Sequence, residues 1–255
     1  MESPERQLSS RLRLPQETDA CLFDLDGVLT ETATLHVQAW KTMFDEYLRR
    51  RSKGSGEELA LFDPVGDYEA YVDGRERYDG VRAFLASRGI ELPEGSPDDA
   101  GSVESVAGLG NRKNDLYLTL LRERGVEPFP GSLRFVRAVR EAGLRTAVVS
   151  ASRNCRAVLQ AVGIEELFDA RVDGATLAEK QLAGKPAPDS FLEAARQLRV
   201  EPGQAAVFED APAGVAAGRA GGFGYVVGVD RRGEAGALLG EGADVVVSDL
   251  GELLG

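Results

Sequence analysis

The chain has 255 residues, a formal net charge of -12, and 43% hydrophobic and 28% charged residues. Such a length suffices for one α/β core and a small second domain. The acidic balance makes nucleic acid and anionic membranes unexpected partners, because both require clustered Lys and Arg. Two cysteines cannot form a disulfide framework, and no apolar run is long enough to span a membrane. We therefore expect a cytoplasmic protein. A monomer is the default expectation.

The beginning of the chain leads to a pair of aspartates. Residues 1–19 are polar and charged and predict an N-terminal extension without a catalytic role. The apolar run 20–23 predicts a buried strand, which ends at Asp24 and Asp26 before Gly27. In an extended strand both carboxylates point to the same side. Because such a pair is costly unless a cation or proton is shared, it predicts a metal site, an acid/base pair or both; a turn with solvated aspartates is the simpler alternative.

A helical block follows the first strand. Residues 36–51 have an apolar face, and the basic run at 49–51 before Gly54 is expected to end this helix. Residues 57–127 keep a helical pattern without a β-branched strand run, with a loop at 93–101. We expect Trp40 in the core of this block. Further core candidates are Leu35, Ala39, Met43, Phe44, Tyr47, Leu48, Val81, Phe84, Leu85, Leu116, Leu118, Leu120 and Leu121.

The remaining chain alternates strand and helix signals. Strands are predicted at 146–150, 168–172, 205–208, 224–229 and 243–247, with helices at 152–162, through 191–198 and at 213–220. This alternation predicts parallel strands with right-handed crossovers, hence a doubly wound α/β sheet. Ser150 follows the first of these strands, Lys185 precedes a helix, and Glu209 and Asp210 follow the strand at 205–208.

The order of these groups resembles the haloacid dehalogenase superfamily, and several motifs resemble its β-phosphoglucomutase family. The motifs are residues 23–36, 39–41, 112–117, 150–154, 185–189 and 209–214. The resemblance implies a Rossmann-like, doubly wound parallel-sheet core formed by residues 20–34 and 129–255. It also implies an inserted α-helical cap domain formed by residues 35–128.

In this resemblance Asp24 is the nucleophile that becomes an aspartyl phosphate, and Asp26 is the general acid/base. Ser150 and Lys185 bind the phosphoryl oxygens. Attack by a carboxylate on a doubly charged phosphoryl group at about 4 Å meets a repulsion on the order of 8 kcal/mol at an effective dielectric near 20, so a cation is required. Mg²⁺ is the expected cofactor. Its expected ligands are Asp24, the carbonyl of Asp26, and Asp210, whereas Glu209 is either a ligand or orients a bound water.

The resemblance also implies a phosphorylated sugar as substrate. The expected substrate-binding residues are Thr32, His36, Arg75, Lys113, Asn114, Ser152, Arg153 and Asn154. We expect Mg²⁺-dependent conversion of β-D-glucose 1-phosphate to D-glucose 6-phosphate through the 1,6-bisphosphate. A sugar-phosphate phosphatase of the same fold is the alternative. A non-catalytic phosphate-sensing or interaction module is a third hypothesis, which the presence of both aspartates argues against.

Overall fold

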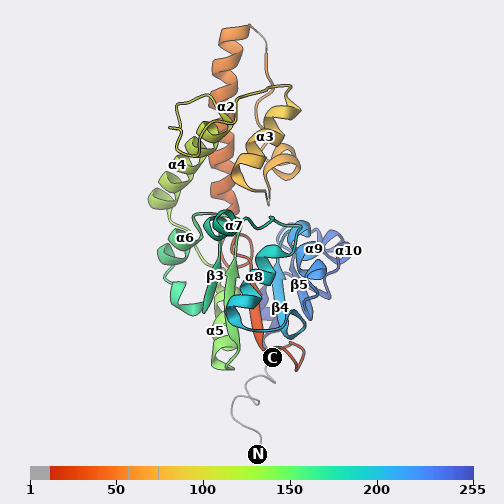
Figure 1. Ribbon diagram of the computed structural model, residues 1–255. Helices are drawn as coiled ribbons and strands as arrows, with labels where there is room; N and C mark the ends of the chain where they lie inside the picture. Colours follow the sequence, from red (N-terminus) through yellow and green to blue (C-terminus); the bar gives the residue numbers. More distant parts are fainter. Residues whose placement is uncertain (1–11, 57, 74) are drawn as a thin grey trace, which may run out of the picture. The chain divides into compact units, whose positions relative to one another are not determined.

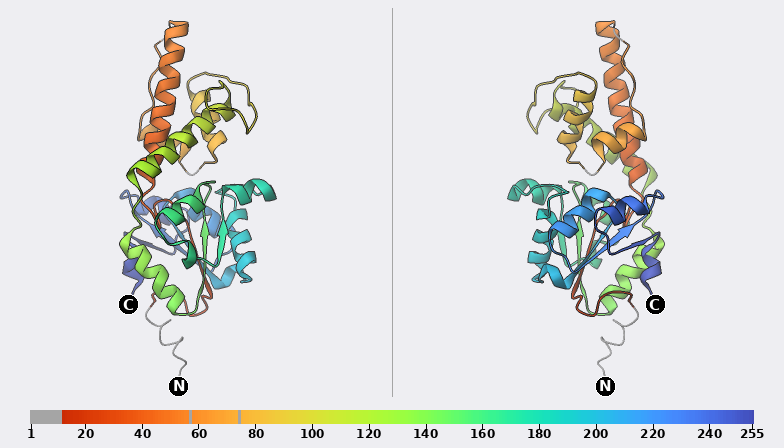
Figure 2. Two further views of the ribbon diagram at one scale, coloured as in Figure 1. Left: turned by 90° about the vertical axis from the view of Figure 1, so that its left-hand side faces the viewer. Right: turned by 90° about the vertical axis from the view of Figure 1, so that its right-hand side faces the viewer.

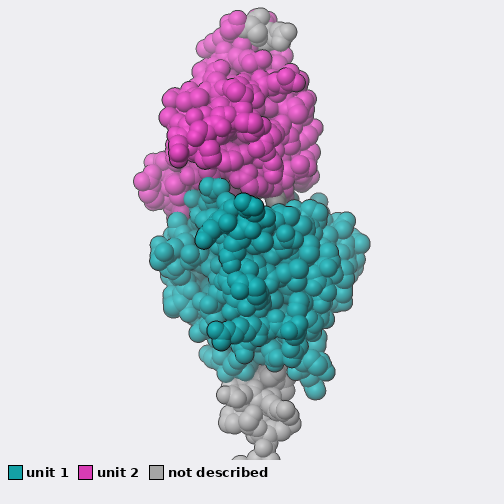
Figure 3. Space-filling model, viewed as in Figure 1, with its two compact units in different colours: residues 1–31, 126–255 teal, residues 32–125 magenta. Residues whose placement is uncertain are grey.

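A computed structural model describes residues 12–56, 58–73 and 75–255. The chain divides into two compact units, drawn in different colours in Figure 3. Unit 1 comprises residues 1–31 and 126–255, and unit 2 comprises residues 32–125, where the sequence analysis expected a helical block at 35–128. Leu8, in the predicted extension, lies outside the described residues, whereas Leu12 is buried and forms a β-bridge with Leu254.

Unit 1 contains a six-stranded parallel sheet (Figure 1) with the strand order β3-β2-β1-β4-β5-β6. The predicted doubly wound α/β fold is therefore confirmed. The strands are β1 (Ala20–Phe23), β2 (Arg145–Val149), β3 (Ala170–Val172), β4 (Ala205–Glu209), β5 (Tyr225–Val229) and β6 (Val245–Val247). The helices are α5 (Pro130–Glu141), α6 (Cys155–Ala161), α7 (Gly174–Lys180), α8 (Asp189–Leu198), α9 (Pro212–Ala220) and α10 (Ala235–Gly240), with short turns η2 (Glu165–Leu167), η3 (Pro202–Gln204) and η4 (Leu250–Leu253).

Alternate side chains of the strands enter two different hydrophobic layers. On one face, Leu22 and Val207 join the apolar side chains of α8, α9 and α10 in one cluster. On the other face, Phe23 stacks on Phe208 with ring centroids 4.6 Å apart, and Phe135 of α5 meets both rings edge-on. Figure 2 shows α5 and α8 on opposite faces of the sheet. This two-sided burial explains why the strands are continuous apolar runs rather than alternating ones.

The regular elements described in unit 2 are all helices: α2 (Ala33–Ser55), the π-helix η1 (Tyr68–Val72), α3 (Arg77–Ser87) and α4 (Val106–Arg124). The predicted apolar face of α2 is buried from Leu35 to Leu48, and Trp40 is buried as expected. The prediction that the helix ends near Arg51 is wrong. It continues to Ser55 and ends where Gly56 adopts a φ of 76°, because the basic side chains project into solvent without interrupting the helix.

The predicted core positions of α4 are only partly correct. Leu121 is buried, but Leu116, Leu118 and Leu120 are only partly buried. Instead Leu109 and Tyr117 fill the fully buried positions of this helix. The helix begins at Ser105, whose hydroxyl accepts the Gly108 N–H at 2.9 Å.

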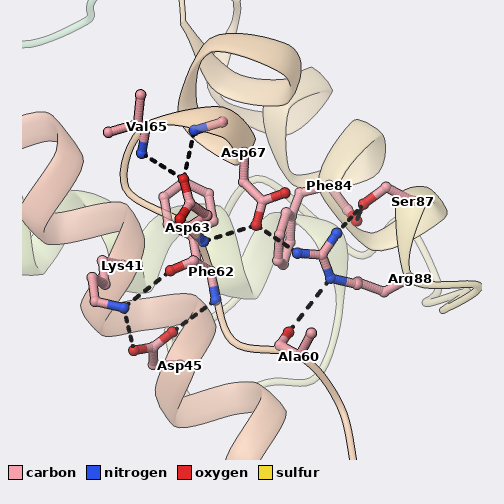
Figure 4. Close-up of polar contacts among 11 residues, drawn as sticks. Lys41, Asp45, Ala60, Phe62, Asp63, Val65, Asp67, Phe84, Ser87 and Arg88 are labelled. Carbon is pink, nitrogen blue, oxygen red and sulfur yellow. Dashed lines mark hydrogen bonds and ion pairs between the residues drawn. The ribbon is translucent and has the colours of Figure 1, made fainter.

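A partly buried polar network holds the segment of residues 58–67 against α2 and α3 (Figure 4). Asp45 accepts the Phe62 N–H at 3.0 Å, and Lys41 donates to the Phe62 carbonyl at 3.0 Å. Asp67 accepts the Asp63 N–H at 2.8 Å and pairs with Arg88 of α3 at 2.5 Å. These bonds satisfy backbone groups of a segment that has no ladder of its own.

Candidate active site

Three functional side chains leave neighbouring strands at the same edge of the sheet. Phe23 of β1 is in register with Val148 of β2 and Phe208 of β4, so Asp24, Ser150 and Glu209 lie at adjacent carboxyl ends. Backbone bonds continue just beyond the strands: the Asp24 N–H donates to the Phe208 carbonyl at 2.9 Å. This edge is where ligands bind in open parallel sheets.

Lys185 brings a positive charge to this edge from the loop before α8. Its Nζ lies 2.5 Å from Asp24 Oδ1 and also contacts the Glu209 carboxylate. The side chains of Lys185, Asp24 and Glu209 are only 8%, 10% and 1% exposed. Lys185, which the sequence predicts to bind phosphoryl oxygens, therefore lies beside the predicted nucleophile.

Three further carboxylates, those of Asp26, Glu209 and Asp210, act on Asp24 at this edge, and the Lys185 ammonium contacts Asp24 and Glu209. Burial raises the pKa of the Asp24 carboxyl; Lys185 opposes this effect, and the other three carboxylates add to it. Burial by itself would lower the pKa of Lys185, but Asp24 and Glu209 raise it above its ordinary value. A divalent cation bound among these carboxylates would offset their mutual repulsion, so the edge suits such an ion.

Glu209 is fixed from two sides. One carboxylate oxygen contacts Lys185, and the other accepts the Ala211 N–H at 3.0 Å. The carboxylate also rests on Gly214, where a Cβ would come within 1.9 Å of Glu209 Oε1. These contacts fix the orientation of the Glu209 carboxylate.

Asp210 approaches the turn that follows the first aspartate. Gly27 has a φ of 82°, and a Cβ there would lie 1.9 Å from Asp210 Oδ2, so only glycine permits this approach. The turn is closed by the Gly27 N–H, which donates to the Thr30 carbonyl at 2.9 Å. Within residues 12–56, 58–73 and 75–255, no three acidic, histidine or cysteine side chains form a ready metal cluster. A Mg²⁺ ion needs no such cluster, since one or two carboxylates with a carbonyl and water suffice.

The loop after β2 is organised by short side chains. The Ser150 hydroxyl is buried and accepts the Ser152 N–H at 3.1 Å, while the Ser152 hydroxyl accepts the Asn154 N–H at 3.1 Å. Arg153 is exposed. The sequence analysis missed Asp173, which caps α7 by accepting the Ala175 and Thr176 N–H groups at 3.0 and 3.1 Å. The sequence does contain a signal for this role, because an Asp between a strand and a helix typically caps the helix N-terminus.

A second cationic group lies within unit 2. Lys113 of α4 is 5% exposed, and its Nζ lies 2.8 Å from His36 Nδ1, which must accept because an ammonium can only donate. The ammonium also lies over the rings of Trp40 and Tyr117, at 4.9 and 5.1 Å from their centroids. Burial, Lys113 and Arg77 together hold the pKa of His36 well below its usual value, so the imidazole is neutral.

Arg77, not Arg75, joins this group. Arg77 Nη2 donates to Asn114 Oδ1 at 2.9 Å, and its charge acts on His36. Arg75 is exposed, and within the described part of the chain its side chain reaches only the Ala70 carbonyl, at 3.4 Å. Thr32 is fully buried at the N-cap position of α2, and its carbonyl accepts the His36 N–H at 3.1 Å.

Comparison with known proteins relates the chain to a well-defined group. Residues 18–222 match the model of the haloacid dehalogenase-like hydrolases. The chain is 59% identical to a β-phosphoglucomutase of Mycobacterium bovis over 246 residues, covering 95% of this chain and 94% of that one. It is 32% identical to a β-phosphoglucomutase of Bacillus subtilis, covering 92% and 91%. A solved β-phosphoglucomutase of Clostridium difficile matches with a TM-score of 0.73 and 26% identity, covering 92% and 93%.

Proposed function

Because the chain belongs to the β-phosphoglucomutase family of haloacid dehalogenase-like phosphotransferases, we propose that it converts β-D-glucose 1-phosphate to D-glucose 6-phosphate. The observation that carries this proposal is the ion pair of Asp24 and Lys185 at the strand ends, 2.5 Å long and surrounded by three further carboxylates. A nucleophile, a phosphoryl-binding cation and carboxylates for a divalent metal are the parts that phosphoryl transfer needs.

In the proposed reaction the phosphoryl group of phosphorylated Asp24 passes to the C6 hydroxyl of β-glucose 1-phosphate, and Asp26 takes the hydroxyl proton. The 1,6-bisphosphate then binds with its C1 phosphate next to Asp24. The C1 phosphoryl group returns to Asp24, and Asp26 returns the proton to the leaving C1 oxygen. One aspartate thus carries the phosphoryl group while the other carries the proton.

Lys185 and Ser150 bind the oxygens of the transferring group in this proposal. The contact of Lys185 with both Asp24 and Glu209 supports this, because the ammonium is held beside the nucleophile before substrate arrives. Ser152 and Asn154, whose backbone groups order the same loop, and the exposed Arg153 would contact the sugar phosphate.

Mg²⁺ is the proposed cofactor, held by Asp24, Asp210 and the carbonyl of Asp26, with Glu209 orienting the group. The carboxylates that act on Asp24 at this edge support it. When bound, the ion neutralises charge on the phosphoryl group. Asp24 directly follows β1, and Asp26 begins the turn of residues 26–30.

Unit 2 is proposed to act as the cap that binds the distal phosphate of the bisphosphate. Lys113 and Arg77 supply positive charge there, with His36, Asn114 and Thr32 beside them. Two cations close together in an acidic chain favour a dianionic ligand. Arg75 is a weaker candidate, since its guanidinium is exposed and apart from this group.

The proposed setting follows from the substrate. A charged sugar phosphate is retained inside cells, so we propose that the protein acts in the cytoplasm, as a monomer. Among the described residues no helix has both the length and the hydropathy needed to cross a bilayer.

A phosphorus NMR time course tests the function. The protein is mixed with Mg²⁺, β-glucose 1-phosphate and a trace of glucose 1,6-bisphosphate, with Asp24→Asn as the inactive control. Glucose 6-phosphate should accumulate with little free phosphate. Free phosphate as the main product would assign a sugar-phosphate phosphatase instead, and no turnover of any phosphomonoester would leave only a binding module.

A further inference from the structure

Arg231 connects three parts of unit 1 that are distant in the sequence. Its Nε donates to the Gly27 carbonyl at 2.8 Å, and its Nη1 donates to the Ser248 carbonyl at 2.7 Å. The face of its guanidinium lies 3.7 Å from the ring centroid of Phe129. The side chain is 18% exposed. A planar guanidinium can donate two such bonds in its plane while its face stacks on an aromatic ring.

The loop that carries Arg231 is itself fixed. Asp230, directly after β5, accepts the N–H groups of Arg232, Gly233, Glu234 and Ala235 at 3.0, 2.7, 2.9 and 3.2 Å. Four bonds to one carboxylate hold the backbone of the loop in a single turn. Arg231 is therefore presented to its partners from a rigid base.

The partners of Arg231 flank the acid/base residue. Gly27 directly follows Asp26, and its carbonyl is the group that Arg231 holds. Phe129 lies on the returning chain, where its N–H donates to the Leu29 carbonyl at 2.9 Å and Pro128 bridges to Thr30. Arg231 thus bonds the start of the turn directly at Gly27 and contacts its far end through Phe129.

The arrangement is not optimised for stability. Nη2 of Arg231 is buried and has no hydrogen-bond partner among the described residues. A buried guanidinium with an unpaired amino group lowers the stability of the fold. Such losses of stability are typical of side chains that position a functional site.

We propose that Arg231 is a positioning residue that fixes the Asp26 turn relative to Asp24. This inference rests on the proposed function. Transfer between Asp24 and a sugar oxygen requires Asp26 at the reacting oxygen, whereas attack by water needs less exact placement. Loss of Arg231 should therefore slow transfer to sugar more than it slows release of phosphate.

The experiment compares Arg231→Ala, Arg231→Lys and Phe129→Leu with Arg219→Ala, all as full-length protein. Arg219 is the matched control, because it also joins distant segments of the same unit: from α9 it donates to the Gly242 carbonyl at 2.9 Å and pairs with Asp244. Phosphorus NMR gives kcat, KM and the ratio of glucose 6-phosphate to free phosphate. Thermal unfolding is measured in parallel.

Arg231→Ala should lower kcat about 10- to 100-fold, change KM by less than about threefold, and raise the share of free phosphate. Arg231→Lys should recover part of kcat, because the charge returns without the planar fork. Arg219→Ala should match wild type in all three quantities. If Arg231→Ala does not fold, Phe129→Leu and Arg231→Lys decide in its place, each with an expected kcat loss of at least about threefold.

Equal kcat and equal product ratios for the Arg231 and Arg219 variants would overturn the positioning role while leaving the proposed function intact. A wild-type protein that makes no glucose 6-phosphate would overturn the proposed function, and with it the inference. The two failures are distinguished by the wild-type time course alone.

Discussion

Replacing Lys185 by Met tests the charge balance of the active-site edge in the protein without metal. Met keeps much of the stem volume but leaves Asp24 and Glu209 buried without a cation. At the 2.5 Å separation of Lys185 and Asp24, the direct attraction is about 7 kcal/mol at an effective dielectric of about 20. Desolvation of the charges offsets part of it, so we expect a loss of about 3–5 kcal/mol of unfolding free energy at neutral pH.

The assay is denaturant unfolding of the metal-free protein, with thermal unfolding as a second probe. For a chain of this size the loss corresponds to a fall of about 6–20 °C in Tm. Lys180→Met is the matched control. Lys180 also pairs with a buried carboxylate, Glu193, at 2.5 Å, but the lysine is 37% exposed and Glu193 keeps Arg196 at 2.7 Å. Because solvent screens this pair, its loss should cost less than about 1 kcal/mol.

The cost of Lys185→Met should depend on pH. Burial raises the pKa of Asp24 above its ordinary value of 3.8, and removal of Lys185 raises it further. The folded variant then holds a proton that the unfolded chain releases, so its stability falls as pH rises above 3.8 and through the folded pKa. The penalty at pH 8 should exceed that at pH 5. A penalty that is equal at both pH values, or no larger than that of Lys180→Met, would refute the proposed charge balance.

Two further predictions concern ligands. Arg77→Ala should raise KM for the glucose 1,6-bisphosphate activator about 10- to 100-fold, while Arg75→Ala changes it less than about twofold; steady-state kinetics would contradict this assignment if the two variants behaved alike. Mg²⁺ at about 100 times its Kd should stabilise the protein by about 2.7 kcal/mol. In differential scanning fluorimetry this gain should grow with pH, because Asp24 must lose its proton, and should disappear in Asp210→Asn; a gain that survives the substitution would argue against Asp210 as a ligand.

The sequence was sufficient for the core because parallel strands deliver the residues that follow them to one edge. Asp24, Ser150 and Glu209 were identified in this way, and the register of β1 with β2 and β4 places them side by side. The contact of Lys185 with Glu209 was not predictable, since it depends on the path of the loop before α8. Arg231 was not singled out, because 204 positions separate it from Gly27 and no local pattern marks it.

Unit 2 was predicted less completely for a different reason. Arg75 and Arg77 are two residues apart at the start of α3, and the choice between them depends on where the helix begins, which is not fixed by composition. Apolar residues lie on more than one face of α4. Periodicity alone therefore did not predict that Tyr117 is more deeply buried than Leu116 or Leu118.

The strand order has a consequence for how the protein is made. β1 is the first strand in the chain but lies in the middle of the sheet, between β2 and β4. During synthesis, the backbone groups of Ala20–Phe23 can pair on one side only after Arg145–Val149 has been made. They can pair on the other side only after Ala205–Glu209 has been made. The helices of residues 32–125 close local contacts first, so nascent chains should form unit 2 early. Until β4 arrives, the apolar first strand is a segment that a chaperone can bind.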